Sequence, residues 1–225
     1  MGRRRKERWL RFLARIANAF GLVFLLVVAT YVLGSLVSYR GWGGAALVAL
    51  TGSCATVAFA TAGAPARKVR GAAWVATATF VLAAVAAATG SAAPASIAGL
   101  TQSLLLAVAG LRVLGAVLAE REVGFRTILG AISVYVILGL LFSFVYGAID
   151  RLQAGDFFGR AAQTGDFLFF SITTLTTTGY GDLVPAAQPG RMLAGLEMLI
   201  GQIFLVTLIA GLVSLWRPGS GARRS

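Results

Sequence analysis

The sequence lacks histidine entirely, contains a single cysteine, Cys54, and has few charged residues. Without histidine the chain offers no imidazole for acid–base catalysis or for a Cys/His zinc site, and one cysteine cannot form a disulfide within the chain. Charged residues make up 12% of the 225 residues, about half the usual share of a soluble domain. No acidic residue occurs between Glu7 and Glu120. These absences argue against a soluble enzyme.

Long apolar runs dominate what is present. Hydrophobic residues make up 58% of the chain, and the mean hydropathy is +0.83. A helix needs about 20 apolar residues to cross a bilayer core of ~30 Å. The uncharged runs, with a break at the Pro-containing stretch 90–96, therefore predict an all-α membrane protein. The six predicted transmembrane helices lie at 16–39, 44–63, 71–89, 96–118, 127–149 and 192–215.

Lysine and arginine residues lie mainly at the ends of these runs. The side of the membrane that carries more of them is expected to be the cytoplasmic side. With a cytoplasmic N-terminus, few of the 20 basic residues fall outside, and Arg112 lies within the fourth span. We therefore expect a multi-pass protein of the cell membrane with both termini cytoplasmic and the loop 150–190 outside. The basic residues expected outside are Arg40, Arg151, Arg160 and Arg191.

The basic residues that give the net charge of +12 lie at the ends of the apolar runs, where they act as topology signals. We therefore expect the lipid bilayer as a partner and no nucleic acid. Residues 1–16 form a basic cytoplasmic N-terminus. Within this segment, the stretch from Arg3 to Lys6 is expected to contact anionic lipid head groups.

The loop between the fifth and sixth spans contains a short apolar stretch. We expect Asp166 to cap a helix over 167–176, which at ~1.5 Å per residue is too short to cross the membrane. A short apolar helix followed by irregular backbone and a full span indicates a re-entrant element. Irregular backbone is tolerated at membrane depth only where it lines a cavity or is buried in protein.

The irregular backbone reads Thr177-Thr178-Gly179-Tyr180-Gly181-Asp182. Gly179 and Gly181 permit a backbone that alternates in hand, so that successive carbonyl oxygens face the same side. Rings of such oxygens can replace the water shell of a potassium ion. Thr177 adds a hydroxyl oxygen, and Tyr180 can pack outward against the short helix. Because one chain supplies one strand of each ring, four chains are needed; the alternative is a glycine-rich external turn.

Residues 129–216 resemble the pore module of potassium channels, with Thr178 in place of the family's valine. Leu183-Val-Pro185, Gly190-Arg191 and Gly201 keep the spacing of simple bacterial channels. The resemblance implies a homotetrameric pore with a re-entrant pore helix and a selectivity filter between the fifth and sixth helices. It also implies K⁺ as the permeant ion, with no cofactor. The implied K⁺-binding residues are Thr177, Thr178, Gly179 and Tyr180, and Gly181 completes the filter.

The segment departs from the family around the filter. Simple channels often carry a pore-helix acid that pairs with the aspartate after the filter, and Thr173 occupies that position here. The family's paired tryptophans are replaced by Phe169 and Phe170. Asp182 therefore lacks two familiar partners, and the expected supports of the filter are Asp182, Thr173 and Asp166.

Two residues of the last span have alternative interpretations. Gly201 falls at the position of the family's inner-helix hinge, but a glycine can equally allow close helix packing. Glu197 is an acid within a span, which makes it a functional candidate. It can hydrogen-bond behind the filter, or it can lie near the outer interface and be solvated.

The first four spans, 17–122, precede the pore domain, 123–217, as in voltage-gated channels, and a short cytoplasmic tail, 218–225, follows. A voltage sensor usually repeats arginine at every third position of its fourth helix, but this helix holds only Arg112. Spans one to three contain no acid to balance moving charge. The sequence therefore predicts weak or absent voltage dependence.

The favoured hypothesis is a passive, potassium-selective homotetrameric channel and not an enzyme. One alternative is a component of a potassium uptake transporter, although such proteins fuse four filter loops and only one occurs here. A membrane-embedded enzyme would need reactive residues that the chain lacks. A non-conducting or regulatory membrane subunit remains open at this stage.

Overall fold

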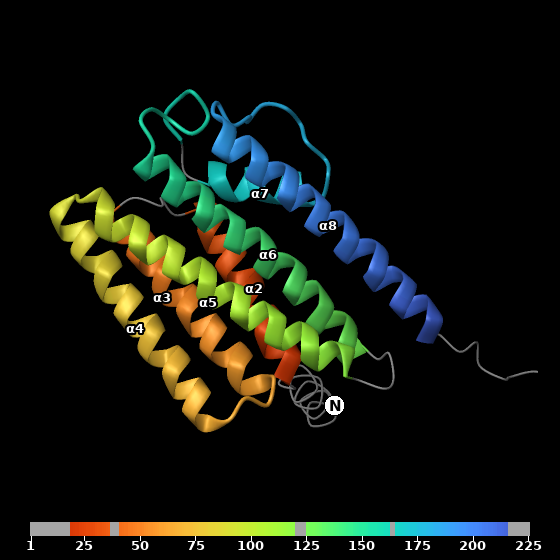
Figure 1. Ribbon diagram of the computed structural model, residues 1–225. Helices are drawn as coiled ribbons and strands as arrows, with labels where there is room; N and C mark the ends of the chain where they lie inside the picture. Colours follow the sequence, from red (N-terminus) through yellow and green to blue (C-terminus); the bar gives the residue numbers. More distant parts are fainter. Residues whose placement is uncertain (1–18, 37–40, 120–124, 163–164, 216–225) are drawn as a thin grey trace, which may run out of the picture.

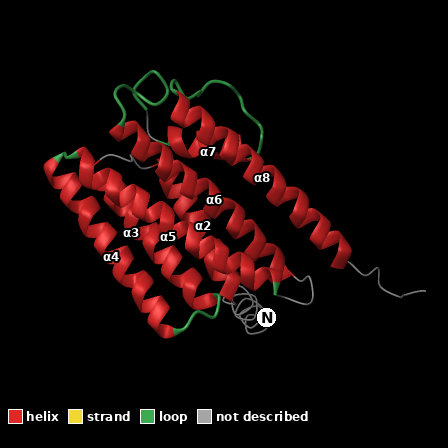
Figure 2. Cartoon of the chain, viewed as in Figure 1, coloured by secondary structure: helices red, strands yellow, loops and turns green. Residues whose placement is uncertain are grey.

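A computed structural model describes residues 19–36, 41–119, 125–162 and 165–215. The predicted basic N-terminus, 1–16, and the predicted tail, 218–225, lie outside these ranges. The described residues are helical apart from connecting loops, and no strand occurs among them (Figure 2). The helices are α2 (Ala19–Leu36), α3 (Gly41–Thr61), α4 (Ala66–Thr89), α5 (Ala92–Leu118), α6 (Phe125–Leu152), α7 (Asp166–Leu175) and α8 (Gln188–Leu215).

Five of these helices, α3 to α6 and α8, are long and apolar enough to cross a membrane, judged by length and composition. They correspond to the second to sixth predicted spans. The described part of α2 has 18 residues and falls among the shorter apolar helices, so the first span stays a prediction. α7 has 10 residues, too few to cross a bilayer core of ~30 Å.

The predicted break in the long apolar run is confirmed. Gly90 ends α4 in the left-handed conformation, with φ of 68°. Ser91 is extended, and α5 begins at Ala92 with Pro94 in its first turn, where proline removes no helical hydrogen bond. The break therefore occupies two residues and not the seven expected.

Helices α3, α4 and α5 run side by side, and α5 and α2 connect this bundle to α6 (Figure 1). A continuous apolar core extends through the bundle into α6, and includes Val27, Ala55, Leu106 and Ile137. The small residues of α3 and α4 allow close approach, since a Cβ atom at Gly52 would lie 2.8 Å from the Cβ of Ala76.

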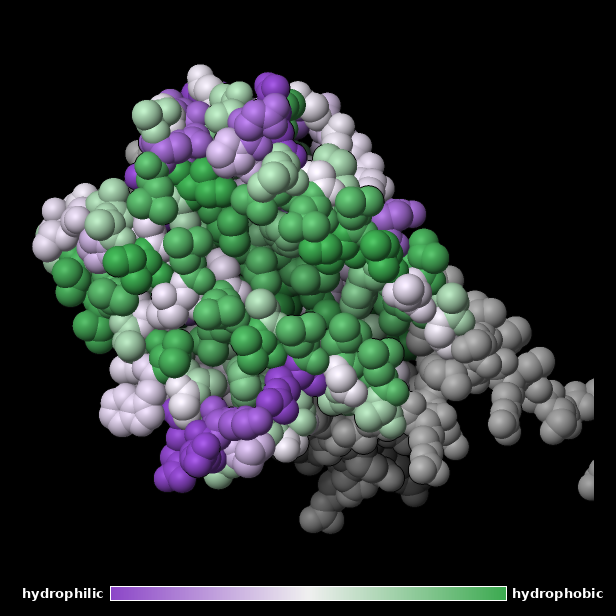
Figure 3. Space-filling view, viewed as in Figure 1, coloured by the Kyte–Doolittle hydropathy of each residue, from purple (hydrophilic) through white to green (hydrophobic). Residues whose placement is uncertain are grey.

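An apolar band covers the visible face of the molecule between two more polar ends (Figure 3). Large apolar side chains are exposed along α4, including Trp74 at 75% and Val81 at 53%. Arg67, Lys68 and Arg70 lie exposed at the start of the same helix. An exposed apolar band of this kind suits a lipid environment, and agrees with a multi-pass membrane protein.

Candidate functional site

The short helix α7 begins differently from the prediction. The residue that caps it is Gly165, with φ of 83° and no side-chain capping bond, so the assignment of Asp166 as the cap is wrong. A Cβ atom at Gly165 would lie 3.1 Å from the Ser35 carbonyl oxygen, which favours glycine there. Asp166 is the first helical residue and forms an ion pair with Arg160 at 3.0 Å. Its negative charge in the first turn still suits the helix dipole.

The C-terminal end of α7 places the filter segment. The Thr177 N–H donates to the Thr174 carbonyl at 2.9 Å, and the Thr178 N–H donates to the Thr173 carbonyl at 2.8 Å. Together these bonds form a Schellman motif. The left-handed residue of the motif is Thr177, with φ of 55°, although glycine or asparagine is usual there. The main chain of α7 therefore fixes the direction in which the segment 177–182 leaves the helix.

Backbone conformation alternates along the filter. Thr177, Gly179 and Gly181 have φ of 55°, 51° and 81°, whereas Thr178 and Tyr180 are not left-handed. This alternation is the condition for successive carbonyl oxygens to face one side. The Gly179 N–H donates to the Thr173 carbonyl at 3.1 Å, which ties the segment to α7 a second time. The filter is therefore an ordered extension of the helix.

Two side chains of the segment 177–182, those of Tyr180 and Thr178, contact residues in or next to α7. The Tyr180 ring stacks on the Phe169 ring, with centroids 6.0 Å apart and planes 5° apart. The two side chains nevertheless remain 71% and 43% exposed. The hydroxyl oxygens of Thr176 and Thr178 lie 2.9 Å apart. Within one chain, the filter thus presents polar backbone and a large aromatic ring to its surroundings.

Of the expected filter supports, Thr173 acts through its main chain. Its carbonyl accepts the two N–H groups named above, while its hydroxyl donates to the Phe170 carbonyl at 3.0 Å. Asp182 is exposed, and no hydrogen bond joins its carboxylate to the described residues. The role of Asp182 as a support stays a prediction.

The loop before α7 and the loop after the segment 177–182 are joined by a main-chain hydrogen bond. The Ala186 N–H donates to the Phe157 carbonyl at 2.8 Å, and the Arg191 Nε–H donates to the Pro185 carbonyl at 2.9 Å. Gly190 leaves room for this contact, because a Cβ atom there would lie 2.7 Å from the Phe157 ring and 2.8 Å from Pro185. The spacing of Pro185, Gly190 and Arg191 thus has a packing reason.

Glu197 is completely buried, with 0% of its surface exposed, so the solvated alternative does not apply. Its Oε2 accepts a hydrogen bond from the Tyr146 hydroxyl of α6 at 2.6 Å. The Ser171 hydroxyl of α7 lies 2.5 Å from Oε1 and also contacts the Gly139 carbonyl of α6 at 2.8 Å. One carboxyl group on α8 therefore contacts hydroxyl groups on α6 and α7. Figure 1 shows these three helices next to one another.

A second junction lies at the end of α7. The Tyr135 hydroxyl donates to the Leu175 carbonyl at 2.9 Å. Gly201 of α8 packs against the same carbonyl so closely that a Cβ atom would overlap its oxygen. This contact gives the close-packing alternative for Gly201 a physical basis, and the hinge stays a prediction.

Sequence reasoning did not identify Tyr146, Ser171 and Tyr135 as parts of the site. It also missed an aromatic cluster in which the Tyr146 and Phe157 rings lie 5.2 Å apart and the Tyr146 and Phe170 rings 5.1 Å. The one available signal was the run of aromatic residues at 167–170 beside the filter. That run did not indicate which residues of α6 would meet it.

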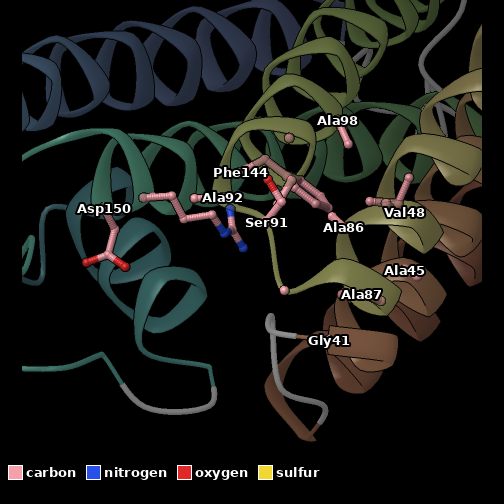
Figure 4. Close-up of a pocket in the computed structure, with 16 residues that line it drawn as sticks. Gly41, Ala45, Val48, Ala86, Ala87, Ser91, Ala92, Ala98, Phe144 and Asp150 are labelled. Carbon is pink, nitrogen blue, oxygen red and sulfur yellow. The ribbon is translucent and has the colours of Figure 1, made fainter.

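A cavity of about 460 Å³ lies between α3, α4, α5 and α6, and no residue of the filter lines it. Figure 4 shows Asp150 on one side of this cavity and Gly41 and Ala45 on the other. Its wall consists largely of glycine and alanine, whose small side chains leave the space unfilled. The cavity is thus a feature of the bundle and is separate from the filter.

The described residues form an all-helical fold with five apolar helices long enough to span a membrane, and the sequence comparisons point to an ion channel domain in its C-terminal part. A family described as "Ion channel" matches residues 131–217, which begin in α6 and extend past the end of α8. The match includes most of α6, all of α7, the segment 177–182 and all of α8. No solved structure matches the chain at a significant level.

Several curated proteins that match this chain are potassium channels. A cyclic nucleotide-gated potassium channel of Rhizobium etli is 36% identical over 46% of this chain and 27% of its own length. A voltage-gated potassium channel of Aeropyrum pernix is 30% identical over 43% of this chain and 30% of its own length. Two pore potassium channel c of rice is 36% identical over 36% of this chain and 17% of its own length.

These matches confirm the resemblance drawn from the sequence: the C-terminal part of this chain is related to potassium channels. The chain spans less than a third of the length of each of these relatives.

Proposed function

We propose that four copies of this chain form a potassium-selective channel through which K⁺ passes down its gradient. The observation that carries the proposal is the alternating backbone hand at Thr177, Gly179 and Gly181. Carbonyl oxygens aligned in this way replace the hydration shell of K⁺. The potassium channels among the relatives support the choice of ion.

The proposal of a homotetramer rests on the residues of the segment 176–182 that a single chain leaves exposed. Residues 176–182 are all exposed, and in the proposed channel their polar backbone lies at membrane depth. Such backbone is tolerated only where it lines a water-filled cavity or is buried in protein. A ring of four copies satisfies both conditions, since each filter faces the central pore and each Tyr180 ring is covered by a neighbouring copy. Both termini are cytoplasmic and the filter's outer end faces outward in this arrangement.

The purified chain, reconstituted alone into liposomes, is expected to carry K⁺ flux that exceeds Na⁺ flux. The measurement is uptake of each ion driven by its own gradient, compared with protein-free liposomes. An absence of flux from the wild-type chain would overturn the proposal and favour a non-conducting subunit. Equal K⁺ and Na⁺ flux would reject selectivity while keeping the pore.

Voltage dependence is expected to be weak or absent. Only Arg112 carries charge along α5, so four copies move at most about four charges through the field. Each charge contributes ~2.3 kcal/mol per 100 mV, and a typical sensor moves about 12 to 16 charges. We expect a nearly flat curve of open probability against voltage in planar bilayers. A steep curve, lost in Arg112→Gln, would contradict this prediction.

A further inference from the structure

The carboxyl group of Glu197 lies where α6, α7 and α8 meet. Within one chain this group is fully buried and has no contact with solvent. Because it is 0% exposed in a single chain, a neighbouring copy cannot reach it, and its partners are those within the chain. These partners are the hydroxyl groups of Tyr146 and Ser171. No lysine or arginine forms an ion pair with Glu197 among the described residues.

The number of hydrogen atoms available around Glu197 indicates whether its carboxyl group is protonated. The Ser171 hydroxyl oxygen makes two short contacts with oxygen atoms, one to Glu197 Oε1 at 2.5 Å and one to the Gly139 carbonyl at 2.8 Å. The 2.8 Å contact has the usual length of an O–H···O hydrogen bond and the 2.5 Å contact is shorter than usual, so each of these two oxygen–oxygen contacts needs a hydrogen atom. A serine hydroxyl supplies only one.

A proton on Glu197 supplies the second hydrogen. The Glu197 carboxyl O–H then donates to the Ser171 oxygen, the Ser171 O–H donates to the Gly139 carbonyl, and the Tyr146 O–H donates to the remaining carboxyl oxygen. Every short contact has a donor and an acceptor in this chain of bonds. Burial favours the same form, because an unpaired carboxylate in apolar surroundings is far more costly than a neutral acid.

We propose that Glu197 is a positioning residue for the selectivity filter and that it acts as a neutral carboxylic acid. Through Ser171 it holds α7 against α6 and α8, and the Thr173 carbonyl of the same helix holds Thr178 and Gly179. Because Thr173 follows Ser171 by only two residues, a shift of the helix at Ser171 moves the filter. This inference rests on the proposed channel function for its effect on selectivity.

The test compares the K⁺-to-Na⁺ permeability ratio of wild type, Glu197→Gln and Glu197→Ala channels, obtained from reversal potentials. A glutamine amide has nearly the same shape and offers an N–H to the Ser171 oxygen and a carbonyl to the Tyr146 hydroxyl, so Glu197→Gln is expected to keep the wild-type ratio. Glu197→Ala leaves the Tyr146 hydroxyl without an acceptor and removes the bond between Ser171 and α8. It is expected to lower the ratio at least about fivefold, the equivalent of about 1 kcal/mol.

If Glu197→Ala does not assemble, the positioning role can still be tested with variants that remove a single hydroxyl group. Tyr146→Phe and Ser171→Ala each remove one hydroxyl and are expected to lower the ratio in the same direction. Tyr31→Phe in α2 and Ser133→Ala in α6 are the matched controls. Tyr31 packs against the bundle and Ser133 is 0% exposed with its hydroxyl bonded to its own helix at Leu129, so both should leave the ratio unchanged.

Infrared difference spectra of wild type minus Glu197→Gln report the protonation state of the Glu197 carboxyl group, and they do not require the protein to conduct ions. A carbonyl-stretch band of a carboxylic acid at neutral pH supports the proposal, whereas carboxylate bands overturn the neutral form. A wild-type ratio in Glu197→Ala, Tyr146→Phe and Ser171→Ala overturns the positioning role. If the wild-type chain conducts no ion, the channel function fails, and the infrared result still decides the state of Glu197.

Discussion

Replacing Gly179 by valine is expected to reduce K⁺ flux to the background of empty liposomes. Gly179 has φ of 51°, and a left-handed conformation costs a non-glycine residue about 1–2 kcal/mol. Four copies multiply this to about 4–8 kcal/mol per pore. A Cβ atom at this position meets nothing within 4 Å inside the chain, so the cost is conformational. The backbone relaxes by rotating its carbonyl out of the row that binds the ion.

Gly63→Val is the matched control for this change. Gly63 has φ of 71°, and a Cβ atom there also meets nothing within 4 Å, but it lies in the turn between α3 and α4. It therefore carries a similar backbone cost without touching the filter, and flux should persist. If Gly179→Val conducts K⁺ as well as Gly63→Val does, the alternating backbone is not the ion pathway.

The sequence predicted two of the three left-handed positions in the segment 177–182, because glycine is the residue that takes a left-handed conformation at little cost. Gly179 and Gly181 adopt it as expected. Thr177 adopts it too, which no sequence pattern predicts, since threonine rarely ends a helix in this way. The hydrogen bonds to the Thr173 and Thr174 carbonyls hold it there. Local main-chain hydrogen bonds at the end of α7 therefore accompany the left-handed conformation of Thr177.

Helix ends were predicted less well than helix positions. Charged residues mark where a span leaves the membrane, but the helical hydrogen bonds continue beyond it, so α6 ends at Leu152 and not at Ile149. α8 likewise begins at Gln188, four residues before the predicted span. The cap of α7 was misplaced by one residue, because an aspartate is favourable both as a cap and in the first turn.

The polar junction behind the filter could not be predicted from sequence. Tyr146 and Glu197 are 51 residues apart and lie on different helices, and no periodicity links them. A lone acid in a span indicates a functional site but does not name its partners. Only the packing of α6 against α7 and α8 brings the two hydroxyl groups to the carboxyl group.

A methyl group at Gly201 is expected to destabilise the assembled protein. In Gly201→Ala the new Cβ atom overlaps the Leu175 carbonyl oxygen, which belongs to the backbone and already accepts the Tyr135 hydroxyl. Overpacking of this kind costs about 1–3 kcal/mol per chain, or about 4–12 kcal/mol for four copies. We expect a lower midpoint when the assembled protein is heated in detergent and its tetramer fraction is measured by size-exclusion chromatography.

Gly195→Ala separates this packing effect from the general effect of alanine in a helix. Gly195 lies on the same helix, and a Cβ atom there meets nothing within 4 Å, so alanine should leave stability unchanged or raise it by up to about 1 kcal/mol. The two substitutions are therefore expected to act in opposite directions. A hinge at Gly201 gives a different result, because a stiffer helix lowers the open probability while the tetramer stays as stable as wild type. That outcome would contradict the packing explanation, since overlap with the Leu175 carbonyl cannot leave the assembly unaffected.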